Sequence, residues 1–290
     1  MALLAVPNWS FGRNKELLRA FGDALDALPL RVHFCDSDVD HNRTVTACSG
    51  SAEALFEMLE SLADLAFESI DLARHVGVHP RIGALDVCPI VVLDGSAASK
   101  QAALTLAEKI GEHLAQKWDL PVYLYEKSER GVHANDLPSL RRGGFGALLG
   151  RELRSDFGPK RAHPKLGVTV VGVREFLIAF NVPLSPHDAA LAKKIASEIR
   201  SMRQEGDERF LGVRALGFAL ASRGMSQVSL NVTLPDITSV DPIVDWIKAR
   251  ARTEGTSAGQ PELIGVIRKR DLPGATHFKL NSAQVVETSG

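Results

Sequence analysis

The sequence predicts a mixed α/β (α+β) chain made of two split βαβ units, each a sheet with helices on one face. Two observations lead to this prediction. Short apolar or alternating segments, typical of strands, are separated by longer segments whose apolar residues recur at helical spacing. The order strand, helix, strand, strand, helix, strand also occurs once in each half of the 290 residues. This βαββαβ order is the one called ferredoxin-like.

In the first half, the expected helices carry one apolar face and the expected strands are short and apolar. The helix that starts at Ala52 is expected to take Ser51 as its N-cap. The expected elements are strand Leu3–Val6, helix Asn14–Leu28, strands Leu30–Phe34 and Thr44–Cys48, helix Ala52–Ala73, strand Val87–Leu93, helix Ala98–Trp118, strand Val122–Tyr125 and helix Pro138–Leu149.

In the second half the same order returns after a segment rich in Pro, Gly and charges, residues 154–167. We therefore expect an N-terminal subdomain over residues 1–166 and a C-terminal subdomain over residues 167–290. The expected elements are a strand region Thr169–Val182, helix Asp188–Arg203, strands Phe210–Ala221 and Gln227–Thr233, helix Asp241–Arg252 and strand Glu262–Ile267.

The composition excludes several classes of protein. Lys and Arg number 34 against 35 Asp and Glu, so the basic excess of a nucleic-acid binder is absent. No apolar run approaches the ~20 residues that span a bilayer, so no membrane partner is expected. The start lacks the charged region of a signal peptide, and the three cysteines lie in apolar segments, as in a reduced cytoplasmic protein.

The segment 74–88 places chemically active side chains in a loop between an expected helix and a buried strand. Pro80 disfavours helix at His79, and glycines on either side relax the backbone. His79 is the candidate general base, because the charge of Arg81 should disfavour its imidazolium and keep a neutral form available near pH 7. A loop histidine that bonds a carbonyl is the alternative.

The polar turn 36–43 contains three aspartates, a histidine, Asn42 and Arg43. It could supply an acid that orients a base, together with donors for a substrate carboxylate. A solvated Asx turn is the alternative. The alternating aspartates resemble the start of a calcium loop, but the required glycine and closing Glu are missing, and no zinc spacing occurs. We therefore expect no metal.

The segment 158–167 packs three cations and a histidine into ten residues. It could attract an anionic ligand such as a polycarboxylate. A solvated linker between subdomains is the alternative, which composition alone slightly favours.

Together these motifs resemble the glutamate formimidoyltransferase (formiminotransferase) family. The most specific match is the run from Gly77 to Pro89, and the resemblance extends from Val6 to about Val266. Other matching runs are Val6–Ser10, Asp40–Val45, Pro121–Tyr125, Asp156–Pro159, Gly172–Asn181 and Gln227–Asn231.

The resemblance implies a homodimeric transferase of one-carbon metabolism and histidine degradation. Such an enzyme moves a formimidoyl or formyl group between N-formimidoyl-L-glutamate and tetrahydrofolate, its co-substrate. The family's catalytic histidine falls on His79, and its acidic partner falls without a gap on Asp36. The implied substrate- and folate-binding residues are Asn8, Asn42, Arg43, Arg81, Gly158, Pro159, Lys160, Arg161, Ala162, His163, Pro164, Lys165, Leu166 and Gly167.

The chain departs from the family at three acidic positions. Phe11 stands where the family usually has Glu, and Gly144 and Gly146 stand where it usually has two more acids. Two other functions therefore remain open. One is a transferase of the same fold with a different amine substrate, and the other is a folate-binding protein without catalysis.

Overall fold

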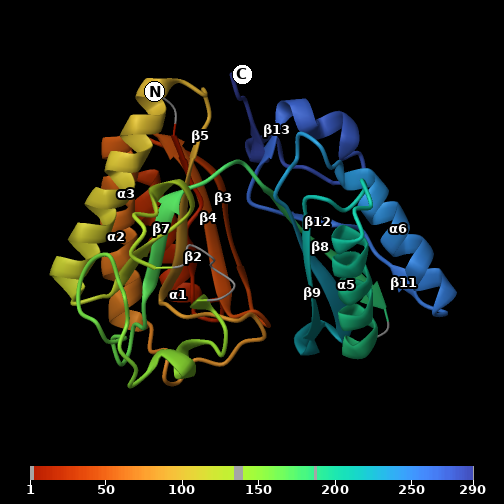
Figure 1. Ribbon diagram of the computed structural model, residues 1–290, viewed down its shortest axis with the longest axis horizontal. Coiled ribbons are helices and arrows are strands. Elements are labelled where there is room, and N and C mark those ends of the chain that lie inside the picture. Colours follow the sequence, from red (N-terminus) through yellow and green to blue (C-terminus); the bar gives the residue numbers. More distant parts are fainter. Residues whose placement is uncertain (1–2, 134–139, 186–187, 290) are drawn as a thin grey trace. The chain divides into compact units, whose positions relative to one another are not determined.

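The computed structural model describes residues 3–133, 140–185 and 188–289, shown in Figure 1. The chain forms two compact units, one up to Arg174 and the other from Glu175 to Thr288. We call them unit 1 and unit 2. The division lies beyond the expected 166/167 boundary, because strand Thr169–Val173 pairs with strands of unit 1.

Unit 1 contains one seven-stranded sheet with the strand order β3-β4-β1/β2-β5-β7-β6. The first four positions are antiparallel and follow the expected βαββαβ order, whereas β7 and β6 extend the sheet in parallel with β5. The strands are β1 Leu3–Ala5, β2 Asn8–Trp9, β3 Arg31–Asp38, β4 Arg43–Gly50, β5 Leu85–Val92, β6 Val122–Leu124 and β7 Thr169–Val173.

Three helices cover one face of this sheet: α1 Lys15–Asp26, α2 Ala52–Ser69 and α3 Ala97–Trp118 (Figure 1). Ser51 caps α2 as predicted, its hydroxyl accepting a hydrogen bond from Ala54 N. The core between sheet and helices includes Trp9, which is fully buried and packs edge-on against Phe21 at 5.3 Å between ring centroids.

The expected helix Pro138–Leu149 begins among residues 134–139, which lie outside the described residues. For its described part, the prediction of a helix is wrong. After Leu140 the chain forms a turn and the short 3₁₀ helix η2 Phe145–Leu148. Gly143 and Gly144 have φ values of 82° and 65°, which interrupt an α-helix. Another 3₁₀ helix, η1, spans Glu126–Ser128.

Unit 2 repeats the split βαβ arrangement with a sheet ordered β11/β12-β8-β10-β9, all antiparallel, and helices α5 and α6 on one face (Figure 1). The two subdomain folds therefore confirm the predicted class. The elements are β8 Ile178–Ser185, α5 Ala189–Gln204, β9 Val213–Leu220, η3 Ala221–Arg223, β10 Met225–Val232, α6 Val240–Thr253, β11 Ser257–Ala258, β12 Glu262–Ile264, β13 Ile267–Arg268, η4 Lys269–Gly274, η5 Ser282–Gln284 and β14 Val285–Val286.

Candidate active site

The loop between α2 and β5 carries His79 and is fixed at several points of its backbone. Val78 N donates to the carbonyl of Asp40 at 3.0 Å. Ile82 N donates to the Asp86 carboxylate at 2.8 Å, and the Ser10 hydroxyl donates to the Gly83 carbonyl at 2.6 Å. The loop is thus tied to the β3–β4 turn, to strand β5 and to the segment after β2, which together hold His79 in one place.

Gly77 allows the loop to approach the β3–β4 turn. A Cβ atom at this position would lie 2.3 Å from the carbonyl oxygen of His41. Any larger residue would push the two segments apart, and His79 would move with them.

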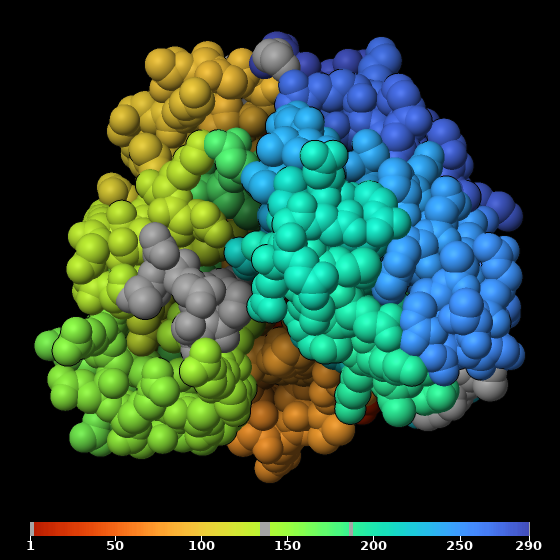
Figure 2. All heavy atoms as spheres, turned by 45° about the vertical axis from the view of Figure 1, so that its right-hand side comes forward, coloured from red at the N-terminus to blue at the C-terminus, as the bar shows by residue number. Residues whose placement is uncertain are grey.

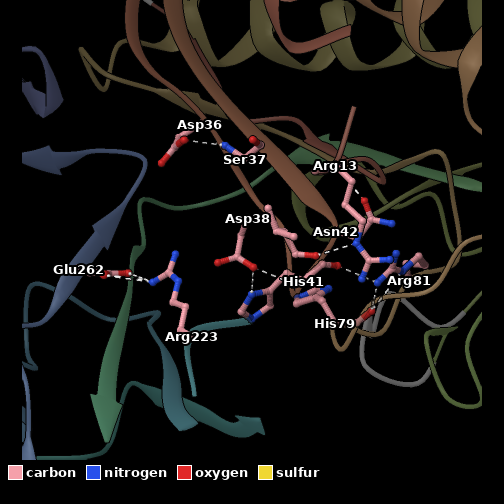
Figure 3. Close-up of polar contacts among 12 residues, drawn as sticks. Arg13, Asp36, Ser37, Asp38, His41, Asn42, His79, Arg81, Arg223 and Glu262 are labelled. Carbon is pink, nitrogen blue, oxygen red and sulfur yellow. Dashed lines mark hydrogen bonds and ion pairs between the residues drawn. The ribbon is translucent and has the colours of Figure 1, made fainter. Parts of the chain in front are cut away.

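Arg81 connects the same segments through its side chain. Its Nη2 atom donates to the carbonyls of His79 at 2.6 Å and His41 at 3.0 Å, and its Nη1 atom contacts the ring of His75. His75 Nε2 in turn lies 3.0 Å from the carbonyl oxygen of Asn42. These contacts mean that Arg81, expected as a substrate donor, holds the backbone around His79 (Figure 3).

His79 is partly buried and lies beside a second histidine, as Figure 3 shows. The ring of His41 is 6.1 Å from that of His79 between centroids. His41 Nδ1 contacts the Asp38 carboxylate at 2.9 Å, and His41 N donates to the same oxygen at 2.7 Å. Asp38 therefore fixes the orientation of His41 next to the candidate base.

The surroundings of His79 favour its neutral form. Burial lowers the pKa of His79 well below its usual range, and the charges of Arg43, Arg141, His41 and Arg81 lower it further. The imidazole is then unprotonated at neutral pH, as a general base must be before it reacts.

Asp36 is not placed with this cluster. It is exposed and accepts a hydrogen bond from Ser37 N at 2.8 Å, and Figure 3 shows it apart from His79. The register of β3 on β4 gives the reason: Asp38 pairs with Arg43 at the turn, whereas Asp36 pairs with Val45 farther along the sheet. Two residues along a strand correspond to about 7 Å.

Asn8 also lies away from His79, inside the sheet. It pairs with Val45 of β4 and Val87 of β5, and its side chain donates to the carbonyl of Val6 at 3.0 Å. Asn42 is closer to the candidate base: its amide oxygen accepts from Gly12 N at 2.8 Å, and its amide nitrogen donates to Val76 in the His79 loop at 3.0 Å.

The 158–167 loop lies against the strand-side end of the His79 loop. Ala84 N donates to the carbonyl of Leu166 at 2.9 Å, and Gly167 exchanges two backbone hydrogen bonds with His163. Gly167 has a φ of 75°, and a Cβ there would lie 2.0 Å from the carbonyl oxygen of Ile82. These contacts fix the conformation of the loop, whereas a solvated linker would not need a fixed conformation.

The cations of this loop point outward. Lys160 and Arg161 are exposed, and Lys165 is partly buried, with its Nζ donating to the Glu68 carbonyl at 3.3 Å. The surrounding segment 140–165, yellow-green in Figure 2, contributes to the molecular surface. These positions suit contact with an extended anion.

Sequence reasoning missed Arg141 and the role of Asp86. The Asp86 carboxylate is buried, accepts from Ile82 N through Oδ1 and contacts Arg141 Nη2 through Oδ2. The positive charges of Arg141 and Arg43 both lower the pKa of His79. The only available signal was the charged pair at 141–142 before two glycines, and it points to no partner.

A cavity of about 480 Å³ lies beside this cluster in unit 1. Its lining includes His75 and Asn42, the cations Arg13 and Arg74, and the side chain of Phe11. Phe11 is 5% exposed and packs against Phe21 at 4.9 Å between ring centroids, so its ring belongs to the core as well as to the cavity wall.

Metal-binding groups and membrane-spanning helices were considered for the described residues only. No group of three or more His, Cys, Asp or Glu side chains is placed there to hold a metal ion. Among the described helices, none combines the length and the apolar character required to span a membrane.

Both units match models of one protein family. Residues 2–174 match the family described as "Formiminotransferase domain, N-terminal subdomain", and residues 179–289 match "Formiminotransferase domain". A glutamate formimidoyltransferase of Streptococcus pyogenes serotype M1 is 31% identical, with 95% of this chain and 92% of that protein covered.

Larger relatives match over part of their length. The formimidoyltransferase-cyclodeaminase of Gallus gallus is 33% identical over 97% of this chain and 52% of that protein. That of Sus scrofa is 33% identical over 94% of this chain and 51% of that protein. The chain thus spans about half the length of these relatives.

Proposed function

Because the chain belongs to the formiminotransferase family, we propose that it transfers a formimidoyl group between N-formimidoyl-L-glutamate and tetrahydrofolate. A glutamate formimidoyltransferase of Thermoplasma acidophilum, 30% identical over 95% of this chain and 91% of that protein, supports this choice of reaction. The proposal includes a cytoplasmic homodimer, as in the family resemblance.

His79 is the general base of the proposed reaction. An amine of tetrahydrofolate attacks the formimidoyl carbon, and a neutral imidazole takes the proton that this amine loses. The same imidazole can then give a proton to the glutamate nitrogen as its bond to carbon breaks. The single observation that carries this role is the placement of His79 in a loop fixed by Arg81 and Asp86, beside His41, where burial and neighbouring positive charges favour the neutral ring.

The acidic partner in the proposed mechanism acts through a second residue and not on the base itself. We propose that Asp38 acts through His41, which lies between it and His79. Asp36, the acid implied by the resemblance, remains a candidate only for a contact made when substrate is bound, because its carboxylate is exposed.

Tetrahydrofolate is assigned to the 158–167 loop. This loop is bonded to the strand that follows His79, so a ligand held there can reach the base. Its exposed cations, Lys160 and Arg161, suit the carboxylates at the far end of a folate.

The proposal is tested with a panel of substrates on the full chain. We expect turnover with formiminoglutamate and tetrahydrofolate, and binding of folinate by calorimetric titration. Folinate binding without turnover of any formimidoyl or formyl donor would favour a folate-binding protein without catalysis. Turnover only with another formimidoyl amine would favour a transferase with a different substrate.

A further inference from the structure

Arg43 and Arg141 place two buried donors near His79 without protein acceptors. The Nε atom of each is inaccessible to solvent and has no hydrogen-bond partner among residues 3–133, 140–185 and 188–289. Buried N–H donors of folded proteins are nearly always bonded. Two such donors beside one candidate base therefore indicate an acceptor that arrives with the substrate.

The acids of the neighbourhood do not supply that acceptor. Asp86, whose side chain is 5% exposed, is engaged by Ile82 N and by the Nη2 atom of Arg141. Asp38 is engaged by the ring and the backbone of His41. The positive charges of Arg43, Arg81 and Arg141 thus exceed the carboxylates available to them, so the expected ligand is an anion.

Guanidinium groups favour planar anions with two oxygens, such as carboxylates. In formiminoglutamate the α-carboxylate is two bonds away from the nitrogen that carries the formimidoyl group. In folate the carboxylates lie at the end opposite the reacting amine. The carboxylate closest to a base that serves the reacting nitrogen is therefore that of the amino acid.

We propose that Arg141 and Arg43 bind the α-carboxylate of the amino-acid substrate beside His79, and that Asp86 is a positioning residue for Arg141. This inference rests on the proposed function. It assigns substrate recognition to Arg141, whereas Arg81 is engaged with the backbone of the His79 and His41 segments.

The kinetic test compares Arg141→Gln with Arg142→Gln, since Arg142 is the adjacent residue and is exposed. Loss of a charge-assisted pair should raise KM for formiminoglutamate about 10- to 100-fold, with KM for tetrahydrofolate within about twofold. Arg142→Gln should match the wild type. Equal increases for both substrates, or equal effects of the two variants, would overturn the assignment.

A binding test separates this inference from the reaction. The wild-type chain is titrated with L-glutamate and with its α-amide, isoglutamine, which keeps the side-chain carboxylate. We expect the wild type to prefer glutamate and Arg141→Gln to lose that preference. If this result is obtained with a wild type that does not turn over formiminoglutamate, the site stands and the proposed reaction fails. An unchanged preference in Arg141→Gln contradicts the site whatever the turnover.

Two further variants separate binding from folding. Arg141→Lys keeps the charge but loses the planar pair of donors, so it should recover part of the affinity. Asp86→Asn removes the charge that holds Arg141 and should raise KM for formiminoglutamate more than it lowers kcat, with glutamate preference reduced. If Arg141→Gln does not fold, the other two variants decide. A preference for glutamate over isoglutamine that is as strong as in the wild type, in either Arg141→Lys or Asp86→Asn, overturns the proposal.

Discussion

His41 lies with its ring 6.1 Å from that of His79, and Asp38 contacts its Nδ1 atom at 2.9 Å. His41 is 1% exposed. Asp38 is the last residue of β3, so this strand positions His41 through the Asp38 carboxylate. This relationship connects the β3–β4 turn with the base of the proposed reaction.

Replacing His41 should change the pH dependence of catalysis. The charge of His41 is one of the causes that lower the pKa of His79, after burial and the charges of Arg43 and Arg141. In His41→Gln that contribution is lost, so the acid limb of the kcat/KM profile should move to higher pH by less than about one unit. His113→Gln, on helix α3, serves as the control. A limb that stays in place or moves to lower pH would contradict this role.

The stability of unit 1 should fall as the pH drops below neutral, in part because of His75. Burial and then the charge of Arg81 lower the pKa of His75 from 6.5 to about 4. A lowered pKa in the folded state means that stability is present above pH 6.5 and is lost as the pH falls toward 4, since the unfolded chain takes up the proton first.

His75→Gln should flatten this dependence, because the amide keeps a donor and an acceptor but does not titrate. Between about pH 7 and about pH 5 the variant should lose about 1 kcal/mol less stability than the wild type, allowing for partial exposure. Chemical denaturation at both pH values measures the difference. Parallel losses in the two proteins would show that His75 is not the cause.

The cations of the 158–167 loop should discriminate between folates. Replacing Lys160, Arg161 and Lys165 by Gln should weaken the binding of polyglutamylated folate more than that of the monoglutamate. Each added carboxylate is attracted by the positive charge of these three residues. The difference should shrink in high salt, since exposed charges are screened. Calorimetric titration of both ligands provides the measurement, and equal losses would return the loop to a structural role.

Restoring the missing acids should affect stability differently at each position. Phe11→Glu places a carboxylate in the core and should cost about 2–4 kcal/mol. Gly144→Glu must adopt a φ of 65° with a ψ of −163°, a region that only glycine readily enters, and should cost about 3 kcal/mol. Gly146 has no atom within 4 Å of its Cβ position, so Gly146→Glu should be tolerated.

Gly146→Glu is therefore the informative variant for substrate choice, with Gly146→Gln as a control of equal size. Higher kcat/KM for formiminoglutamate in the Glu variant alone would show that the acid acts on the substrate. Equal activity of wild type and both variants would show that the missing acid has no role in this chain.

The fold could be predicted from the sequence because its signals are local. Helical spacing and caps such as Ser51 indicate the elements, and their order indicates the two split βαβ units. The division after Arg174 depends on the parallel pairing of β7 with β5, between residues about 80 positions apart, such as Val87 and Val170. Periodicity carries no information about such a pairing.

For the candidate site, the sequence could indicate only what lies within one segment of the chain. Pro80 and the flanking glycines mark the His79 loop, and the local sequence places Arg81 within it. The contact of Arg141 with Asp86 joins residues 55 positions apart, and strand register separates Asp38 from Asp36. Neither follows from residue types alone, because both depend on how distant segments pair.

The most direct test of the central claim is the rate of formimidoyl transfer from formiminoglutamate to tetrahydrofolate by the wild-type chain and by His79→Gln, measured together with the folinate affinity of both. Loss of a general base should lower the rate about 100- to 10,000-fold. The folinate Kd should change by less than about threefold, because the 158–167 loop is unaltered. A His79→Gln enzyme that transfers the group at a rate close to that of the wild type would contradict the account.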